Sequence, residues 1–481
     1  MLRAFLKDSA IYTVPAFISR GLSLLLVPLY TRVLSPADYG SLDLLMIFAN
    51  LVSLTVGMEV SQGVARFYAG ESDEIRKCQY ASSAFWFVFG AYTLFAIFAF
   101  IYSGILATWV LGREGLETLF QIGVIYTWLN GLFYLVQNQL RWELRSKQYA
   151  TASLLVAIVT ACTAVMLAYG LRWGFRGLLW GMVAGVAVGV IYGLCHLRQS
   201  FRFLFVFDRL KEMLAFSAPL VPSSIAVFIS AYVDRMMINH FLSVDEVGLY
   251  GIGFRLASVV SLVMVGFRGA LTPLVYKYHR ESDTPSQLAT IFRLFLTFVL
   301  LIYIGLTLFA DDILILMTTP EYYGASQVVL YLVPAVLLSQ MYIFAPGIGI
   351  AKKTHIILWI NLCGAILNTL LNWWFIPLLG ISGAALATLM GYGCTFSAYM
   401  ISSQRLYYVP HDWLRIATAV LSILAVITLM KVMAPHGALR WLMIMVSFFS
   451  AFLAILATRL LRFSEISSLR QLVIEKFSRQ T

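Results

Sequence analysis

The chain has 481 residues, of which 60% are hydrophobic and only 12% are charged. Soluble domains carry roughly 25% charged residues, so this composition excludes a protein built mainly from soluble domains. The formal net charge of +11 could indicate nucleic-acid binding, but the basic residues lie between apolar runs, as is typical of charges that flank membrane spans.

About fourteen apolar runs follow one another along the chain. Each is about as long as the roughly twenty residues with which a helix crosses a bilayer, or longer. The first run carries Arg20 in its middle and is too long for the hydrophobic region of a signal peptide, so we expect an uncleaved helix. The predicted spans are 9–34, 41–69, 80–111, 117–140, 150–171, 175–197, 214–241, 248–276, 291–318, 326–349, 355–377, 381–403, 413–433 and 438–461.

The distribution of Lys and Arg predicts the orientation. If the N-terminus is cytoplasmic, the segments on that side hold most of the basic residues, as the positive-inside rule requires. The opposite side then carries only Arg32, Arg113, Arg172, Arg176, Lys431 and Arg440. We therefore expect a multi-pass protein of the cytoplasmic (inner) membrane with both termini in the cytoplasm.

The sequence contains an internal repeat. Residues 34–40 and 242–248 both read L-S-x-x-acid-x-G, and residues 174–177 and 380–383 both read G-x-x-G. The two pairs have nearly equal offsets, 242 − 34 = 208 and 380 − 174 = 206, which favours duplication over chance. The longest connection, 198–213, is too short for a domain and is interpreted as the linker between the two copies.

The repeat predicts the architecture. Six predicted helices separate the copies, and because that number is even both copies face the same way across the membrane. The expected fold is all-α, with two six-helix lobes related by an axis along the membrane normal and a central cavity between them. The lobes are assigned to 1–200 and 201–405, and an additional helix pair with a cytoplasmic tail to 406–481.

Three stretches carry a family resemblance. They read R-V-L-S-P-A-D-Y-G at 32–40, A-P-L-V-P at 218–222 followed by Asp234-Arg235, and N-T-L-L-N at 368–372 followed by G-I-S-G-A-A-L-A at 380–387. In this order they resemble the polysaccharide transporters of the multidrug/oligosaccharidyl-lipid/polysaccharide exporter superfamily, the Wzx-type flippases. The additional pair departs from the usual twelve helices of that family and is similar to the extra pair of the peptidoglycan lipid II flippases.

The resemblance implies a function. A Wzx-type protein would translocate an isoprenoid-diphosphate-linked oligosaccharide by alternating access, for lipopolysaccharide or exopolysaccharide biosynthesis. Its partners would be that lipid-linked oligosaccharide, membrane lipid and a glycan polymerase or other biosynthesis proteins, with no nucleic acid and no cofactor.

Charged side chains within the predicted spans are the candidate site residues, because charges in hydrocarbon usually face a partner or a water-filled cavity. The arginine guanidinium also suits a diphosphate, because it donates two parallel hydrogen bonds. The predicted substrate-binding residues are Arg20, Arg235, Arg255 and Arg268. Arg293 is expected to snorkel to the cytoplasmic end of its helix, and Asp43 to be solvated near the outer surface.

Two carboxylates leave alternatives open. Asp234 and Arg255 lie at similar depth on either side of the turn near Asp245, so they could form a structural pair or contact substrate. Glu59 could neutralise Arg20 or couple transport to protons or sodium. None of the histidines has metal-ligand spacing, the five cysteines form no C-x-x-C pair, and no Walker motif is present.

Two other classes remain as rivals. A cation or drug exporter of the same superfamily predicts a net acidic cavity, whereas the arginines within the spans outnumber the acids. A membrane glycan polymerase or acyltransferase predicts a large outer loop or a catalytic His/Asp/Glu cluster, and the sequence has neither. The protein is therefore not expected to be an enzyme.

Overall fold

The computed structural model describes residues 21, 26–68, 70–264, 267, 271, 275, 278–351, 353–433, 437–458 and 460. This part of the chain contains helices and no strand, which confirms the all-α prediction. Within it, eleven helical segments are long and apolar enough to cross a membrane, and one of them, His355–Leu406, is interrupted at Gly380. The predicted count of fourteen stays a prediction, because most of the span 9–34 and part of 248–276 lie outside the described residues.

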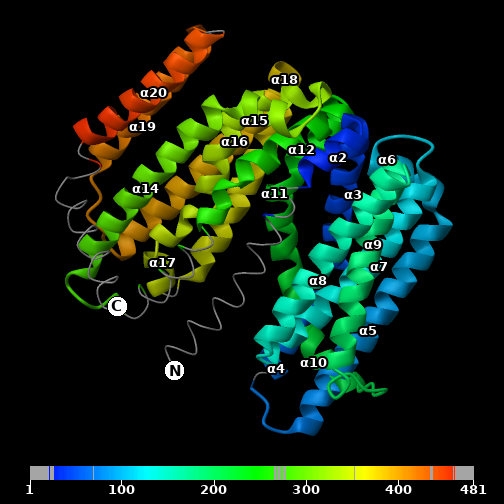
Figure 1. Ribbon diagram of the computed structural model, residues 1–481. Coiled ribbons are helices and arrows are strands. Elements are labelled where there is room, and N and C mark those ends of the chain that lie inside the picture. Colours follow the sequence, from blue (N-terminus) through cyan, green and yellow to red (C-terminus); the bar gives the residue numbers. More distant parts are fainter. Residues whose placement is uncertain are drawn as a thin grey trace, which may run out of the picture. The chain divides into compact units, whose positions relative to one another are not determined.

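The helices fall into two compact units, and each is described by itself. The first unit contains the chain up to Leu256 together with Leu314–Val328 and Asn361–Gly391. In Figure 1, α3, α5, α7, α8 and α9 run side by side in it as a bundle. Its helices are α2 (Val27–Val33), α3 (Pro36–Thr55), α4 (Val60–Tyr68), α5 (Glu74–Ile101), α6 (Ser103–Leu111), α7 (Glu117–Trp142), α8 (Ser146–Ala164), η1 (Val165–Gly170), α9 (Gly174–His196), α10 (Phe207–Ser217), η2 (Ala218–Leu220), α11 (Val221–Phe241), α12 (Val244–Ser258, to Leu256), η3 (Pro320–Ala325) and the middle of α18 (Thr354–Leu406).

The second unit contains Ala257–Ile313, Val329–Ile360 and the chain from Tyr392 onward. Its elements are α14 (Thr284–Leu308), most of α16 (Ser326–Leu338), η4 (Met341–Phe344), α17 (Gly347–Ile350), the two ends of α18, α19 (Trp413–Met433) and α20 (Ala438–Ala457), while α15 (Ala310–Met317) is divided between the units. The additional helix pair is present as α19 and α20, which pack against α14. Arg440 at the start of α20 forms an ion pair of 2.6 Å with Asp312.

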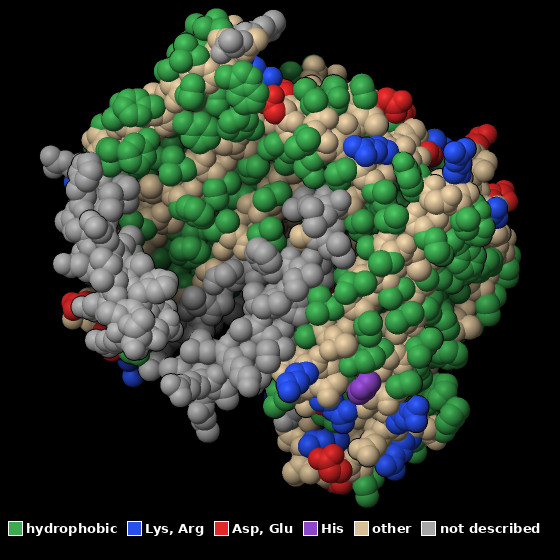
Figure 2. All heavy atoms as spheres, viewed as in Figure 1, with side chains coloured by type: hydrophobic (Ala, Val, Ile, Leu, Met, Phe, Trp, Pro, Cys, Tyr) green, Lys and Arg blue, Asp and Glu red, His purple; other side chains and the backbone are tan. Residues whose placement is uncertain are grey.

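Polar turns gather at the two ends of the first unit. At one end, Arg113 pairs with Asp38 at 2.6 Å, and the Tyr322 hydroxyl donates to the Leu34 carbonyl at 2.9 Å. At the other end, the Arg145 guanidinium donates to the His196 carbonyl at 2.6 Å. Figure 2 shows hydrophobic side chains over the visible face of α5, α7, α8 and α9, and charged ones mainly near the ends of these helices. This distribution is that of helices crossing a bilayer.

The first repeated motif forms a close helix crossing. Ser35 caps α3 by accepting from the Asp38 amide at 3.2 Å, and Ser243 accepts from the Glu246 amide at 3.3 Å at the start of α12. A Cβ at Gly40 would lie 2.0 Å from the Val244 carbonyl oxygen. A Cβ at Gly248 would likewise lie 2.0 Å from the Pro36 carbonyl oxygen. The offset of 208 relates Gly40 to Gly248 and Pro36 to Val244. The two copies of the motif therefore pack on each other through equivalent atoms.

The second repeated motif begins with a glycine at positive φ in both copies. Gly174 and Gly380 have φ of +55° and +61°, which favours glycine. Three residues later, a Cβ at Gly177 would lie 2.6 Å from the Ala168 backbone nitrogen, and one at Gly383 would lie 2.2 Å from the Phe375 carbonyl oxygen. Both turns therefore fold a helix closely onto the preceding one.

The segment predicted as a linker is fixed to α5. Residues 201–206 form neither helix nor strand, and α10 begins at Phe207. The Arg202 amide donates to Ser82 Oγ at 2.9 Å, and the Val206 amide donates to Ser83 Oγ at the same distance. Because side chains of α5 satisfy this backbone, the segment belongs to the first bundle. The lobe boundaries themselves stay a prediction.

His411, in the short connection between α18 and α19, should make stability depend on pH. Its ring packs against Phe292 at 4.8 Å and Trp413 at 5.1 Å, and burial lowers its pKa to about 4. The unfolded histidine protonates near pH 6.5, whereas the folded one resists protonation. We expect thermal stability in detergent to fall as the pH drops from about 6.5 towards 4.

His411→Phe should flatten this dependence, and His196→Phe, at an exposed histidine, should leave it unchanged. An unaltered pH profile in His411→Phe would contradict the assignment.

Candidate functional site

A break in the second predicted span forms one wall of the candidate site. The sequence predicted a continuous helix over 41–69, which is wrong, because α3 ends at Thr55 and α4 begins at Val60. Met58 and Glu59 between them have φ of +46° and +50°. Side chains other than glycine seldom adopt this left-handed conformation, and such strain is concentrated at functional sites.

Side chains from other helices stabilise the break. Ser217 at the end of α10 donates through Oγ to the Met58 carbonyl at 2.9 Å. Ser224 of α11 donates through Oγ to Glu59 Oε1 at 3.0 Å. Polar groups freed by a broken membrane helix are tolerated where they are buried in protein or face a cavity. The second condition holds here, since Glu59 lines a cavity.

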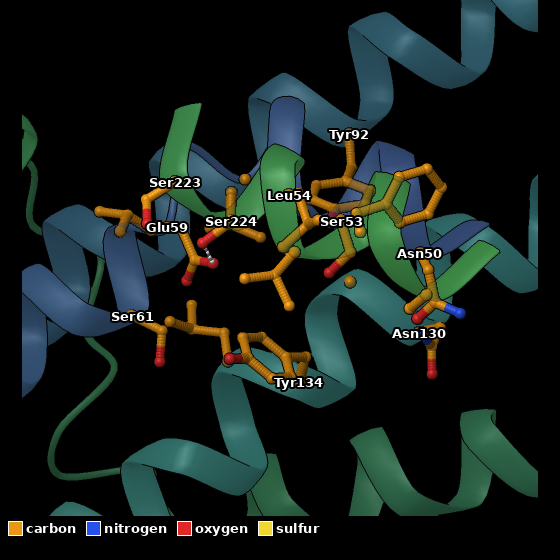
Figure 3. A pocket seen from close by; sticks show the side chains of 18 of the residues that line it. Asn50, Ser53, Leu54, Glu59, Ser61, Tyr92, Asn130, Tyr134, Ser223 and Ser224 are labelled. Atoms are coloured by element: carbon orange, nitrogen blue, oxygen red, sulfur yellow. Dashed lines mark hydrogen bonds between the residues drawn. The ribbon is translucent and has the colours of Figure 1, made fainter. Parts of the chain in front are cut away.

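The cavity has a volume of about 520 Å³ and lies wholly within the first unit. Its wall comes from α3, the break, α4, α5, α7 and α11, and Figure 3 shows Glu59, Ser223 and Ser224 toward one end and Asn50 and Asn130 toward the other. The volume falls in the range of small-molecule sites, roughly 300–1,000 Å³.

The lining combines apolar and polar side chains and is almost without charge. Glu59 is the only charged side chain among the described residues that line the cavity. The neutral hydrogen-bonding side chains are Asn50, Ser53, Ser61, Tyr92, Asn130, Tyr134, Ser223, Ser224 and Tyr232. Ser61 is 4% exposed, and its hydroxyl has no hydrogen-bond partner among the described residues. The wall therefore offers amides and hydroxyls to a ligand.

A buried ion-pair cluster lies beside this cavity. Arg235 of α11 is 3% exposed, and its guanidinium contacts Asp43 of α3 at 2.8 Å and Asp234 at 3.2 Å. The Tyr250 hydroxyl donates to the second oxygen of Asp234 at 2.6 Å. Tyr232, which lines the cavity, places its ring centre 5.8 Å from the Arg235 guanidinium carbon.

This cluster corrects two expectations from the sequence. The structural pair of Asp234 is with the adjacent Arg235, not with Arg255. Asp43 is not solvated but only 19% exposed in its side chain, because Arg235, 192 residues away, packs against it. Arg255 lies with its guanidinium carbon 4.9 Å from the centre of the Tyr39 ring.

The other residues that the sequence predicted for the site are not part of this cluster. Arg20 and Arg268 lie outside the described residues, so the proposed pair of Arg20 with Glu59 stays a prediction. Arg293 is 8% exposed, so it does not snorkel to the surface as expected. No cluster of His, Cys, Asp or Glu suited to a metal ion occurs in the described part of the chain.

The sequence analysis missed the neutral residues of the cavity wall. Asn50 and Asn130 lie within predicted spans, where an amide needs a hydrogen-bonding partner or a polar surrounding. These two amides could have been identified in the sequence, but only charged residues were considered as site candidates. For the helix break at Met58 and Glu59, Gly57 was the only local sequence feature that favours the end of a helix.

Broken helices around a polar cavity inside a bundle are typical of secondary transporters, and the fold here is that of a multi-pass helical membrane protein. A family model described as polysaccharide biosynthesis protein matches residues 29–327, more than half of the chain. The protein belongs to this family.

Relatives are distant in sequence and similar in fold. A protein of the Lsg locus of Haemophilus influenzae is 23% identical over 288 residues, 58% of this chain and 68% of that protein. The lipid II flippase MurJ in an inward closed conformation has a TM-score of 0.69 at 15% identity, covering 96% of this chain and all of that one. An inward-facing multidrug resistance MATE family transporter has a TM-score of 0.64 at 14% identity, covering 80% and 94%. The resemblance of the sequence to this superfamily is confirmed for family and fold.

Proposed function

We propose that this protein is a flippase that moves an isoprenoid-diphosphate-linked oligosaccharide from the cytoplasmic to the outer leaflet by alternating access. The observation that carries the proposal is a cavity with many hydrogen-bonding side chains between membrane-spanning helices, in a member of a polysaccharide biosynthesis family. The connections between the described helices are too short to form a catalytic domain. Transport, not synthesis, is the activity that this arrangement supports.

The head group and the tail of such a substrate would be separated. The cavity wall can hydrogen-bond a polar head group, while the hydrocarbon tail remains in lipid beside the apolar helix faces (Figure 2). Arg20, Arg255 and Arg268 are the residues we assign to the diphosphate. Arg235 is held by two carboxylates and is assigned to structure. We place the protein in the cytoplasmic membrane with both termini in the cytoplasm.

A cation or drug exporter is the second candidate. One observation favours it, because the only charge among the described residues of the cavity wall is the Glu59 carboxylate. The many neutral amide and hydroxyl groups weigh against it, since a lipophilic cation needs one carboxylate and aromatic surface but few hydrogen-bonding partners.

Deleting the gene should cause the lipid-linked saccharide to accumulate on the cytoplasmic leaflet, because its assembly continues while its export stops. Mass spectrometry of the lipid extract would identify the compound, and a plasmid copy of the wild-type gene should restore the normal level. The flippase assignment is wrong if the saccharide is not made in the deletion strain, or if it is exported but not polymerised.

A further inference from the structure

The cavity beside Glu59 is chemically unsuited to one half of the proposed substrate. A diphosphate is acidic and accepts hydrogen bonds, so protein sites for it supply Arg, Lys or clustered N–H groups. Among the described lining residues, the charged group is instead a carboxylate. Two anions at close range repel each other strongly in a medium of low dielectric constant. The diphosphate therefore does not belong next to Glu59.

The same wall suits the other half of the substrate. Saccharide hydroxyls both donate and accept hydrogen bonds, and Asn50 and Asn130 offer amide groups that do the same. The Ser61 hydroxyl is buried, lines the cavity and has no partner in the described part of the chain. A buried hydroxyl without a partner is unfavourable, so a ligand that pairs with it gains affinity.

Glu59 adds a directed acceptor. Its Oε1 accepts from the Ser224 hydroxyl at 3.0 Å, which fixes the carboxylate at the cavity wall and leaves lone pairs for a ligand donor. The left-handed backbone at Glu59 projects this side chain from the gap between α3 and α4. A hydroxyl or acetamido N–H of a sugar is the matching donor.

We infer that this cavity binds the saccharide part of the lipid-linked substrate, while the diphosphate binds elsewhere in the protein. This inference rests on the proposed function and divides its site into a saccharide subsite and a diphosphate subsite. Asn50, Ser61, Asn130 and Glu59 provide the hydrogen bonds to sugar hydroxyl and amide groups.

The test compares two probes on the full-length protein in lipid nanodiscs. One is undecaprenyl diphosphate, and the other is the lipid-linked saccharide fraction extracted from cells that lack this protein. Asn130→Ala and Glu59→Gln should each weaken binding of the saccharide-linked lipid about tenfold and leave undecaprenyl diphosphate binding unchanged. The matched control is Gln121→Ala, which removes an amide from the same helix that bonds Ser103 and lies outside the cavity wall.

Other outcomes overturn the inference in different ways. Equal losses for both probes, or no loss for either, remove the saccharide subsite and leave the flippase proposal standing. Binding of tetraphenylphosphonium that Glu59→Gln abolishes, without binding of the saccharide-linked lipid, assigns the cavity to cations. If the wild-type protein binds neither isoprenoid lipid, the proposed function fails together with the inference.

Discussion

Arg235→Ala should lower the free energy of unfolding by about 3–5 kcal/mol. The side chain is 4% exposed and lies between the Asp43 and Asp234 carboxylates. Its removal leaves two like charges close together without this counterion, and Asp234 is buried away from water. The packing of the guanidinium carbon 4.3 Å from the centre of the Phe254 ring is lost as well.

Thermal unfolding in detergent measures this effect, and a matched control is available. Arg113→Ala breaks the pair with Asp38, in which both side chains are about 30% exposed, and should cost less than about 1 kcal/mol. Neutralising the whole cluster, with Arg235→Leu, Asp43→Asn and Asp234→Asn, should recover much of the lost stability. If Arg235→Ala instead leaves the fold intact and removes transport alone, Arg235 belongs with the substrate-binding arginines.

The sequence was sufficient where a local pattern determines the structure. The apolar runs predicted 413–433 and 438–461, and α19 and α20 cover Trp413–Met433 and Ala438–Ala457. The apolar runs also predicted separate spans at 355–377 and 381–403, and a φ of +61° at Gly380 interrupts α18 between them. Both predictions depend on residues that are neighbours in the chain, so the pattern of apolar runs was enough.

The sequence was insufficient where distant residues decide. From the sequence, Asp43 was expected to be a solvated residue near a span end. In the structure Arg235, 192 positions away, packs against it. The break before Val60 is held by Ser217, 159 positions beyond Met58. Reasoning from neighbouring residues assumes that a charge near a span end faces water and that an apolar run is a continuous helix. Contacts with distant residues make both assumptions wrong here. The saccharide subsite is of this kind, since five separate helices and the break build its wall.

Gly40→Ala and Gly248→Ala should each destabilise the protein by at least about 1–3 kcal/mol, and by similar amounts. The added methyl group would lie 2.0 Å from a backbone carbonyl oxygen in either case, Val244 for one and Pro36 for the other. A backbone oxygen cannot turn away as a flexible side chain can, so the two helices must separate. The control is Gly90→Ala in α5, which meets nothing within 4 Å and should raise stability by about 0.5–1 kcal/mol.

The double variant tests whether the two glycines form one contact. Once the first methyl group has separated α3 from α12, the second finds the space already open. We therefore expect Gly40→Ala with Gly248→Ala to lose clearly less stability than the sum of the two single changes. Additive losses, or a large effect at one glycine and none at the other, would mean that the crossing is not the symmetric contact that the offset of 208 implies. Because equivalent atoms make both halves of the crossing, we expect the same repeated motif to make both glycines costly to replace.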